Sequence, residues 1–171
     1  EYSLDSMHFL KDMIDILGEL GWDLHDVVAE GAYSQFELDF HYTDLLQMAD
    51  RLVFLKILLK EIAKKHDMFV TFMPKPTIGD WRSGGHINFS LNNIKDNSNI
   101  FKDGDKWSQE AMYAVGGLLS NSEAITAITC PTVNSYNGLV PTVGGFEGGV
   151  HTWAPVNITY GHNNRSAQFR L

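Results

Sequence analysis

The chain has 171 residues, 44% of them hydrophobic and 12% aromatic, which is enough for one ordinary domain with a sizeable core. Its formal net charge of -8, with only 13 Lys and Arg, disfavours a nucleic-acid surface but not a cation site. The sequence contains no basic stretch leading into an apolar segment at its start and no apolar run of about eighteen residues. Its single cysteine, Cys130, allows no intrachain disulfide. We therefore expect a globular, soluble and cytoplasmic protein.

The chain begins with a predicted helix followed by a predicted β-hairpin. Apolar residues recur at helical spacing over residues 7–20. Residues 22–29 and 35–42 are typical of two strands joined by a short turn. Because the strands of a hairpin lie side by side, Glu30 and Glu37 should be near each other in space although they are separated along the chain.

A second and longer helix is predicted from residue 44 to about residue 66. Asp44 and Gln47 resemble a capping box at its start. Apolar residues at helical spacing form its stripe toward the core: Leu45, Met48, Leu52, Leu55, Leu59 and Ile62. Its lysines are assigned to the solvent side and to the last turn, where positive charge suits the helix dipole: Lys56, Lys60, Lys64 and Lys65.

The central stretch, residues 71–90, joins two predicted strands through a loop rich in Gly and Pro. The first strand covers residues 69–73. In the second, polar and apolar residues alternate, so that they face opposite sides: His86, Asn88 and Ser90 on one, Ile87, Phe89 and Leu91 on the other. Polar side chains on one face of a strand beside a glycine-rich loop indicate a binding site. The alternative is a half-buried strand with a solvent-exposed outer face.

The second half of the chain combines two predicted helices with a glycine-rich loop. The helices cover residues 108–119 and 122–128, and Gly116 and Gly117 indicate close packing of the first. Residues 134–149 contain so many glycines that we expect a lid or substrate loop without regular structure. Two strands close the chain, at residues 154–160 and 167–171.

Long helices interleaved with hairpins, without a regular strand–helix alternation, predict an α+β fold. Within it, Glu30, Glu37 and His86 form the sharpest group of candidate site residues, because each lies in or beside a strand next to a turn. Two carboxylates and an imidazole could hold Mg²⁺ or Mn²⁺. The alternative is a pair of surface carboxylates and a hydrogen-bonded histidine.

Four sequence blocks, in order, resemble the glutamine synthetase family over nearly the whole chain. The first is the EGAYSQFE hairpin at residues 30–37, followed by a matching helix. The second combines TFMPKP with SGGHINFSL, which resembles the ATP and metal signature of the family. The last two blocks are PTVNSY and NRSAQFR. The resemblance implies antiparallel strands that form part of a catalytic half-barrel, flanked by long helices.

The resemblance also implies an activity and two metal ions. The family uses ATP to phosphorylate a side-chain carboxylate and then lets ammonia or an amine displace the phosphate. By analogy Glu30 and Glu37 hold one divalent metal, Mg²⁺ or Mn²⁺, and His86 helps to hold the second. The metals assist both steps by Lewis-acid catalysis.

Further site residues follow from the same resemblance. Asn88 and Ser90 are expected to line the ATP site, Asn88 standing where many members have a second histidine. Arg165 and Arg170 are expected to face the phosphates, and Arg165 to take part in catalysis. Glu147 is a candidate for the lid glutamate that helps deprotonate the incoming ammonium.

Two departures fall on positions that normally bind glutamate. Trp81 and Arg82 stand where the family has Asn-Gly, and Asn137 and Gly138 stand where it has Lys-Arg. Loss of an arginine that pairs with a carboxylate is costly in a desolvated site unless another group replaces it. Either Arg82 is that replacement or the acid substrate is not glutamate.

We interpret residues 1–171 as a single partial domain, an internal piece of a catalytic domain that would be inactive alone. The expected partners are a small-molecule acid and amine, and further copies of the subunit, because sites in this family form between neighbours. Neither nucleic acid nor a membrane is expected. The alternatives are the same ligase chemistry on another acid and a non-catalytic relative.

Overall fold

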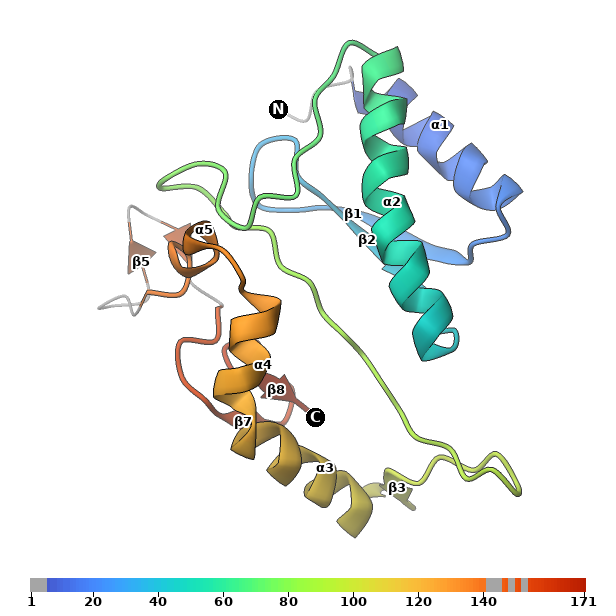
Figure 1. Ribbon diagram of the computed structural model, residues 1–171, viewed down its shortest axis with the longest axis vertical. Helices are drawn as coiled ribbons and strands as arrows, with labels where there is room; N and C mark the ends of the chain where they lie inside the picture. Colours follow the sequence, from blue (N-terminus) through green and yellow to red (C-terminus); the bar gives the residue numbers. More distant parts are fainter. Residues whose placement is uncertain (1–5, 141–145, 148–149, 152–153) are drawn as a thin grey trace. The chain divides into compact units, whose positions relative to one another are not determined.

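The computed structural model describes residues 6–140, 146–147, 150–151 and 154–171. The chain divides into two compact units, Glu1–Phe72 and Met73–Leu171 (Figure 1). Within the part described, no helix combines the length and the apolar character needed to cross a bilayer.

The first unit opens with helix α1 (Ser6–Glu19), within a residue of its predicted bounds. Gly21 follows it with a φ of +66°, a conformation that glycine adopts without strain. The next residue, Trp22, donates a backbone hydrogen bond of 3.0 Å to the Leu17 carbonyl oxygen, which closes the helix end. Gly21 therefore acts as the C-cap glycine of α1.

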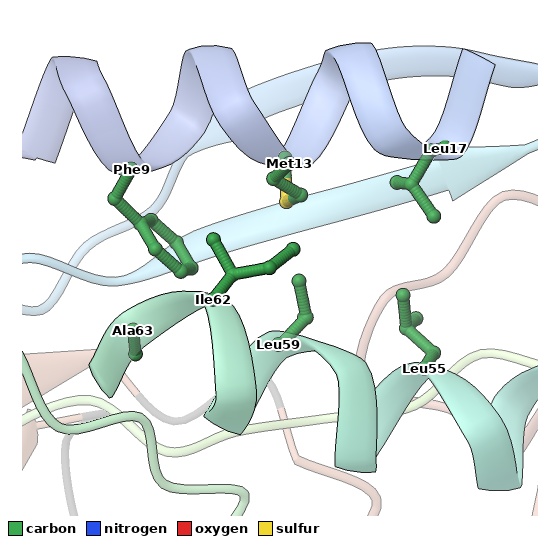
Figure 2. Packing of buried hydrophobic residues seen from close by; sticks show 7 residues of the cluster. All are labelled: Phe9, Met13, Leu17, Leu55, Leu59, Ile62 and Ala63. Carbon is green, nitrogen blue, oxygen red and sulfur yellow. The ribbon is translucent and has the colours of Figure 1, made fainter. Parts of the chain in front are cut away.

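Helix α2 (Leu45–Lys65) packs against α1 and forms the core of this unit with it. Asp44 caps α2 by accepting a hydrogen bond of 2.9 Å from the backbone N–H of Gln47. The buried side chains come from one stripe on each helix, and Figure 2 shows them facing one another: Phe9, Met13 and Leu17 on α1, and Leu55, Leu59, Ile62 and Ala63 on α2. The predicted α2 stripe is buried only in its C-terminal half, because Leu45 is 82% exposed and Leu52 is 44% exposed. The α2 lysines are exposed, as predicted.

Strands β1 (Leu24–Ala29) and β2 (Phe36–Phe40) form the predicted antiparallel hairpin. Val28 lies opposite Glu37 and Ala29 opposite Phe36, and the register shifts only between Leu24 and Asp26, far from the turn. The partly buried side chains of this hairpin pack against the helical core: Leu24, Val27, Leu38 and Phe40. This packing fixes which face of the hairpin remains available to solvent.

The strands predicted at residues 69–73 and 86–91 are not formed. Residues 68–91 have no ladder partner among the described residues, and residues 84–91 are exposed on both faces. Alternation of polar and apolar residues creates a strand only where backbone N–H and C=O groups find a neighbouring strand. The extended chain is held instead by isolated bonds, such as the 2.8 Å bond from the Ser83 N–H to the Pro74 carbonyl oxygen.

The described residues of the second unit form three helices, two of which were predicted. Helices α3 (Gln109–Ser120) and α4 (Ser122–Thr129) have nearly the predicted bounds, and Ser108 caps α3 through a 3.1 Å bond from Ala111 N–H. Helix α5 (Val133–Tyr136), which begins with a capping box of Thr132 and Ser135, was missed because a single turn gives no periodic pattern. The expectation of close packing at Gly116 and Gly117 is wrong: apart from the adjoining residues and the backbone of α3, no described atom lies within 4 Å of where a Cβ would stand on either glycine.

The strands formed by the described part of the second unit are each two residues long. The antiparallel pairs are β3 (Lys102–Asp103) with β4 (Lys106–Trp107), and β5 (Phe146–Glu147) with β6 (Val150–His151). The parallel pair is β7 (Tyr160–Gly161) with β8 (Phe169–Arg170), which replaces the longer closing strands predicted. Within the loop expected at residues 134–149, α5 and β5 are regular structure, while residues 141–145 and 148–149 lie outside the described residues and the lid role stays a prediction. The described residues thus form a mixed α and β structure with four separate two-stranded sheets.

The α1–α2 core yields a stability prediction. Met13 is 1% exposed, so Met13→Ala should lower the free energy of local unfolding of α1 and α2 by about 2–5 kcal/mol, the sum of lost burial and the cavity left behind. Hydrogen exchange of the α1 and α2 amides measures that free energy. Ile14→Ala is the matched control: Ile14 is 45% exposed, and its truncation should change exchange much less. Equal effects of both substitutions would contradict the packing.

Candidate functional site

Glu30 and Glu37 lie on the same face of the β1–β2 hairpin. The Glu30 N–H donates a 2.9 Å hydrogen bond to the Gln35 carbonyl oxygen, so Glu30 faces Gln35 across the turn. Glu37 lies two residues beyond Gln35, and a two-residue step along a strand returns to the same face. Diagonal neighbours of this kind have Cα atoms roughly 7–8 Å apart, within reach of long side chains. The predicted proximity of the two carboxylates is therefore confirmed by the register.

The chemistry of this pair fits a hard divalent cation. Both side chains are partly exposed, and carboxylate oxygens are the preferred ligands of Mg²⁺ and Mn²⁺. One Glu30 carboxylate oxygen accepts a 3.2 Å hydrogen bond from the Gly31 N–H, which steadies it next to the turn. Among the described residues there is no cluster of three or more His, Cys, Asp or Glu side chains arranged to hold a metal. His86 belongs to the second unit, so its role as a ligand with the two glutamates stays a prediction.

His86, Asn88 and Ser90 lie on the extended chain of residues 84–91, and all are exposed. The far end of this segment is anchored by a 2.9 Å bond from the Ile100 N–H to the Leu91 carbonyl oxygen. The Phe89 ring also meets Phe101 edge to face at 5.7 Å. The three polar residues are thus presented on a segment fixed at both ends.

Asn134 joins α5 to the central loop, a role that the sequence analysis did not assign. Its side-chain oxygen accepts a 2.8 Å hydrogen bond from the Lys75 N–H, and its side-chain nitrogen donates a 2.8 Å bond to the Lys75 carbonyl oxygen. The Lys75 ammonium in turn donates to the Asp80 carbonyl oxygen. A single side-chain amide therefore holds together the central loop and α5, at residues 59 positions apart in sequence.

Arg82 lies against Gly138, and both are among the four residues at which the sequence departs from the family pattern. A Cβ added at Gly138 would stand 3.3 Å from both Cδ and Nη1 of Arg82, and Gly138 is buried. Removal from water lowers the pKa of the Arg82 guanidinium from its ordinary value, because burial disfavours the charged form. The structure thus brings together residues that the sequence analysis named separately.

Arg165 and Arg170 lie on the closing segment of the second unit, and both are exposed. Parallel pairing of β7 with β8 and a 3.2 Å bond from the Leu171 N–H to the Gly161 carbonyl oxygen hold this segment together. The Gln168 side chain ties it to α4 through a 3.3 Å bond to the Thr126 hydroxyl. The backbone of Glu147 is in β5, but its side chain lies outside what the structure describes.

Comparison with known proteins decides the family. Residues 3–171 match the sequence profile of the glutamine synthetase catalytic domain. The chain belongs to the glutamine synthetase family. It is 44% identical over 138 residues to the glutamine synthetase of Pyrococcus abyssi, covering 81% of this chain and 29% of that relative. It is 42% identical over 164 residues to the glutamine synthetase of Methanosarcina mazei, covering 94% of this chain and 34% of that relative.

A solved structure described as a GmaS/ADP complex has the same fold. It aligns with a TM-score of 0.83 and 33% identity, covering 99% of this chain and 40% of that one. The chain thus spans about a third of the curated glutamine synthetases that it matches. Membership of the family rests on nearly all of this chain.

The amide of Asn134 generates the prediction of this subsection. Asn134→Ala removes both bonds to Lys75, so that the backbone N–H and C=O of Lys75 bond to water instead. The amides of residues 75–83 should therefore exchange faster. A loss of roughly 1.4 kcal/mol of local stability corresponds to about tenfold faster exchange. Hydrogen exchange of the full-length protein measures the change. Asn97→Ala, on an exposed turn of the same unit, is the control. Unchanged exchange of residues 75–83 in Asn134→Ala would show that the amide does not hold the loop.

Proposed function

We propose that this chain is part of the catalytic domain of an ATP-dependent carboxylate–amine ligase. The observation that carries the proposal is the match to the glutamine synthetase catalytic domain over residues 3–171. The paired carboxylates of Glu30 and Glu37 support it, since a non-catalytic scaffold has no need of such a pair on one hairpin face. The ADP bound in the GmaS relative supports a nucleotide substrate.

The proposed reaction joins glutamate to ammonia or an amine, giving glutamine or a γ-glutamylamide. ATP phosphorylates the side-chain carboxylate, the amine attacks the acyl phosphate, and inorganic phosphate leaves. Arg165 and Arg170 would neutralise charge on the phosphates, and Asn88 and Ser90 would line the nucleotide site. Glu147 would assist loss of a proton from the ammonium.

Mg²⁺ or Mn²⁺ fits the proposed site through its carboxylate donors. Glu30 and Glu37 would hold one ion, and His86 would contribute to a second. A bound ion would polarise phosphoryl oxygens as a Lewis acid. In the whole protein we propose that the strands join a catalytic half-barrel, and that sites form between subunits of a homo-oligomer.

Two alternatives follow from the departures at Arg82 and Gly138. The same ligase chemistry could act on an acid other than glutamate, because the contact between these residues reshapes the position next to α5. A non-catalytic relative that binds nucleotide is the second alternative, since function depends on the site rather than on the fold. The first alternative predicts that phosphate is released from ATP, and the second predicts that it is not.

The deciding experiment uses the full-length protein with ATP, Mg²⁺ and a panel of acids and amines, beginning with glutamate and ammonia. We expect phosphate release that requires both substrates, and an amide product identified by mass spectrometry. Phosphate release that occurs with another acid but not with glutamate would support the first alternative. No turnover of any pair, together with ATP binding that does not need a divalent metal, would refute the ligase.

The metal ligands give a separate prediction. Glu37→Gln keeps the shape of the side chain but removes its charge, so the metal concentration needed for half-maximal activity should rise by about tenfold or more. His86→Ala should weaken metal-dependent ATP binding in calorimetry while the exchange of core amides stays unchanged, because an exposed side chain leaves no core cavity. Glu19→Gln, an exposed glutamate at the end of α1, is the control. Unchanged metal dependence in Glu37→Gln would contradict its role.

A further inference from the structure

We propose that His25 and His41 form a binding site for a transition-metal ion of the Zn²⁺ class, at the end of the β1–β2 hairpin away from its turn. The two imidazole rings meet there, with their centroids 4.7 Å apart and their planes at 67°. The site is separate from the glutamate pair near the turn, and the inference does not depend on the proposed ligase function.

A β-bulge brings His25 to its neighbour. The register shifts between Leu24 and Asp26, so β1 has one residue more than β2 at this point, and that residue is His25. A bulge of this kind redirects the side chain of the extra residue. The backbone pairing continues one residue past β2, because the His41 N–H donates a 2.9 Å hydrogen bond to the Asp23 carbonyl oxygen. Both histidines are therefore carried by paired backbone.

The two rings lie on the face of the hairpin that is turned away from the helical core. Phe40, which precedes His41, packs against that core, and successive side chains of a strand point to opposite faces. Both histidines are exposed. Within the part of the chain that the structure describes, neither ring makes a hydrogen bond or an ion pair with another side chain. Their nitrogens are thus available to a ligand from solvent.

The spacing of the rings fits two imidazoles bound to one ion. A metal ion lies about 2.0–2.1 Å from an imidazole nitrogen, so two rings at adjacent positions of one ion have centroids roughly 4.6–5.3 Å apart. The observed 4.7 Å lies within this range. Because the strands already fix the two backbones, rotation of the exposed side chains is enough to bring one nitrogen of each ring to the ion.

The donor atoms select a transition metal over Mg²⁺. Imidazole nitrogen suits Zn²⁺, Cu²⁺ and Ni²⁺, whereas Mg²⁺ prefers oxygen ligands. Asp26 and Asp39 lie opposite each other beside the pair, and their negative charge favours a cation. No third His, Cys, Asp or Glu among the described residues is arranged to complete a cluster, so water would fill the other positions. The site should therefore bind Zn²⁺ more weakly than a closed site with four protein ligands.

This site and the glutamate pair cannot share one ion. His41 lies four residues beyond Glu37 along the same strand direction, which is roughly 13 Å at the rise of an antiparallel strand. A hard ion at the glutamates and a transition metal at the histidines could therefore be bound at the same time.

The test is a calorimetric titration of Zn²⁺ into the full-length protein in saturating Mg²⁺. His25→Gln and His41→Gln should each weaken one Zn²⁺-binding event by about tenfold or more, because a single imidazole loses the advantage of a second ligand held close by. The double variant should bind only slightly more weakly than either single variant, since the first substitution already removes the pair. His8→Gln, which removes an exposed histidine of α1, is the control and should change nothing.

Hydrogen exchange of the wild-type protein locates the ion without any substitution. Zn²⁺ at about ten times its Kd should slow exchange of the amides at residues 24–28 and 37–41 by about tenfold, because the ion binds only the paired strands. Mg²⁺ at the same concentration should leave these amides unchanged. Slower exchange elsewhere in the chain, with none at this end of the hairpin, would contradict the site.

Two titration results would also overturn the inference. Zn²⁺ binding that is unchanged in both single variants would place the ion elsewhere and make the ring contact a structural one. Weakening that adds up independently in the double variant would show that the two rings do not share an ion. Neither result bears on phosphate release from ATP, so the proposed ligase function stands or falls separately.

Discussion

The position of the central loop against α5 depends on one side-chain amide. Asn134 satisfies both the N–H and the C=O of Lys75, as a neighbouring strand would, in a loop that pairs with no strand among the described residues. The prolines on either side of Lys75 keep its backbone extended, so these two groups point outward to a partner. Through this bond the loop that carries Arg82 is positioned against α5 and Gly138.

Local patterns predicted the elements that are stabilised within their own segment. Helix α1 with Gly21, helix α2 with Asp44 and helix α3 with Ser108 each have a cap and an apolar stripe close together in sequence. Helix α5 was missed because it is a single turn, too short for a periodic pattern. The strands expected at residues 69–73 and 86–91 depended on a partner that alternation cannot reveal.

The same distinction applies to the candidate site. Glu30 and Glu37 could be paired from the sequence, because the turn between them is short and the register follows from it. The contact of Arg82 with Gly138 could be anticipated only from two departures in a family pattern, since nothing in the local sequence links the positions. Nothing in the sequence predicted the two bonds between Asn134 and Lys75, because an asparagine side chain usually bonds to the backbone within its own turn or cap.

The register of the β1–β2 hairpin restricts how this sequence can vary. Glu30 and Glu37 share a face because directly opposite residues of an antiparallel pair point to the same side, and Glu37 lies two residues beyond Gln35, which is opposite Glu30. Insertion or deletion of a residue in the turn changes the loop and leaves this pairing in place, whereas a one-residue slip within a strand moves its carboxylate to the core face. Relatives that conserve the pair should therefore differ freely in the identity and number of the turn residues, while insertions within the paired strands should be rare.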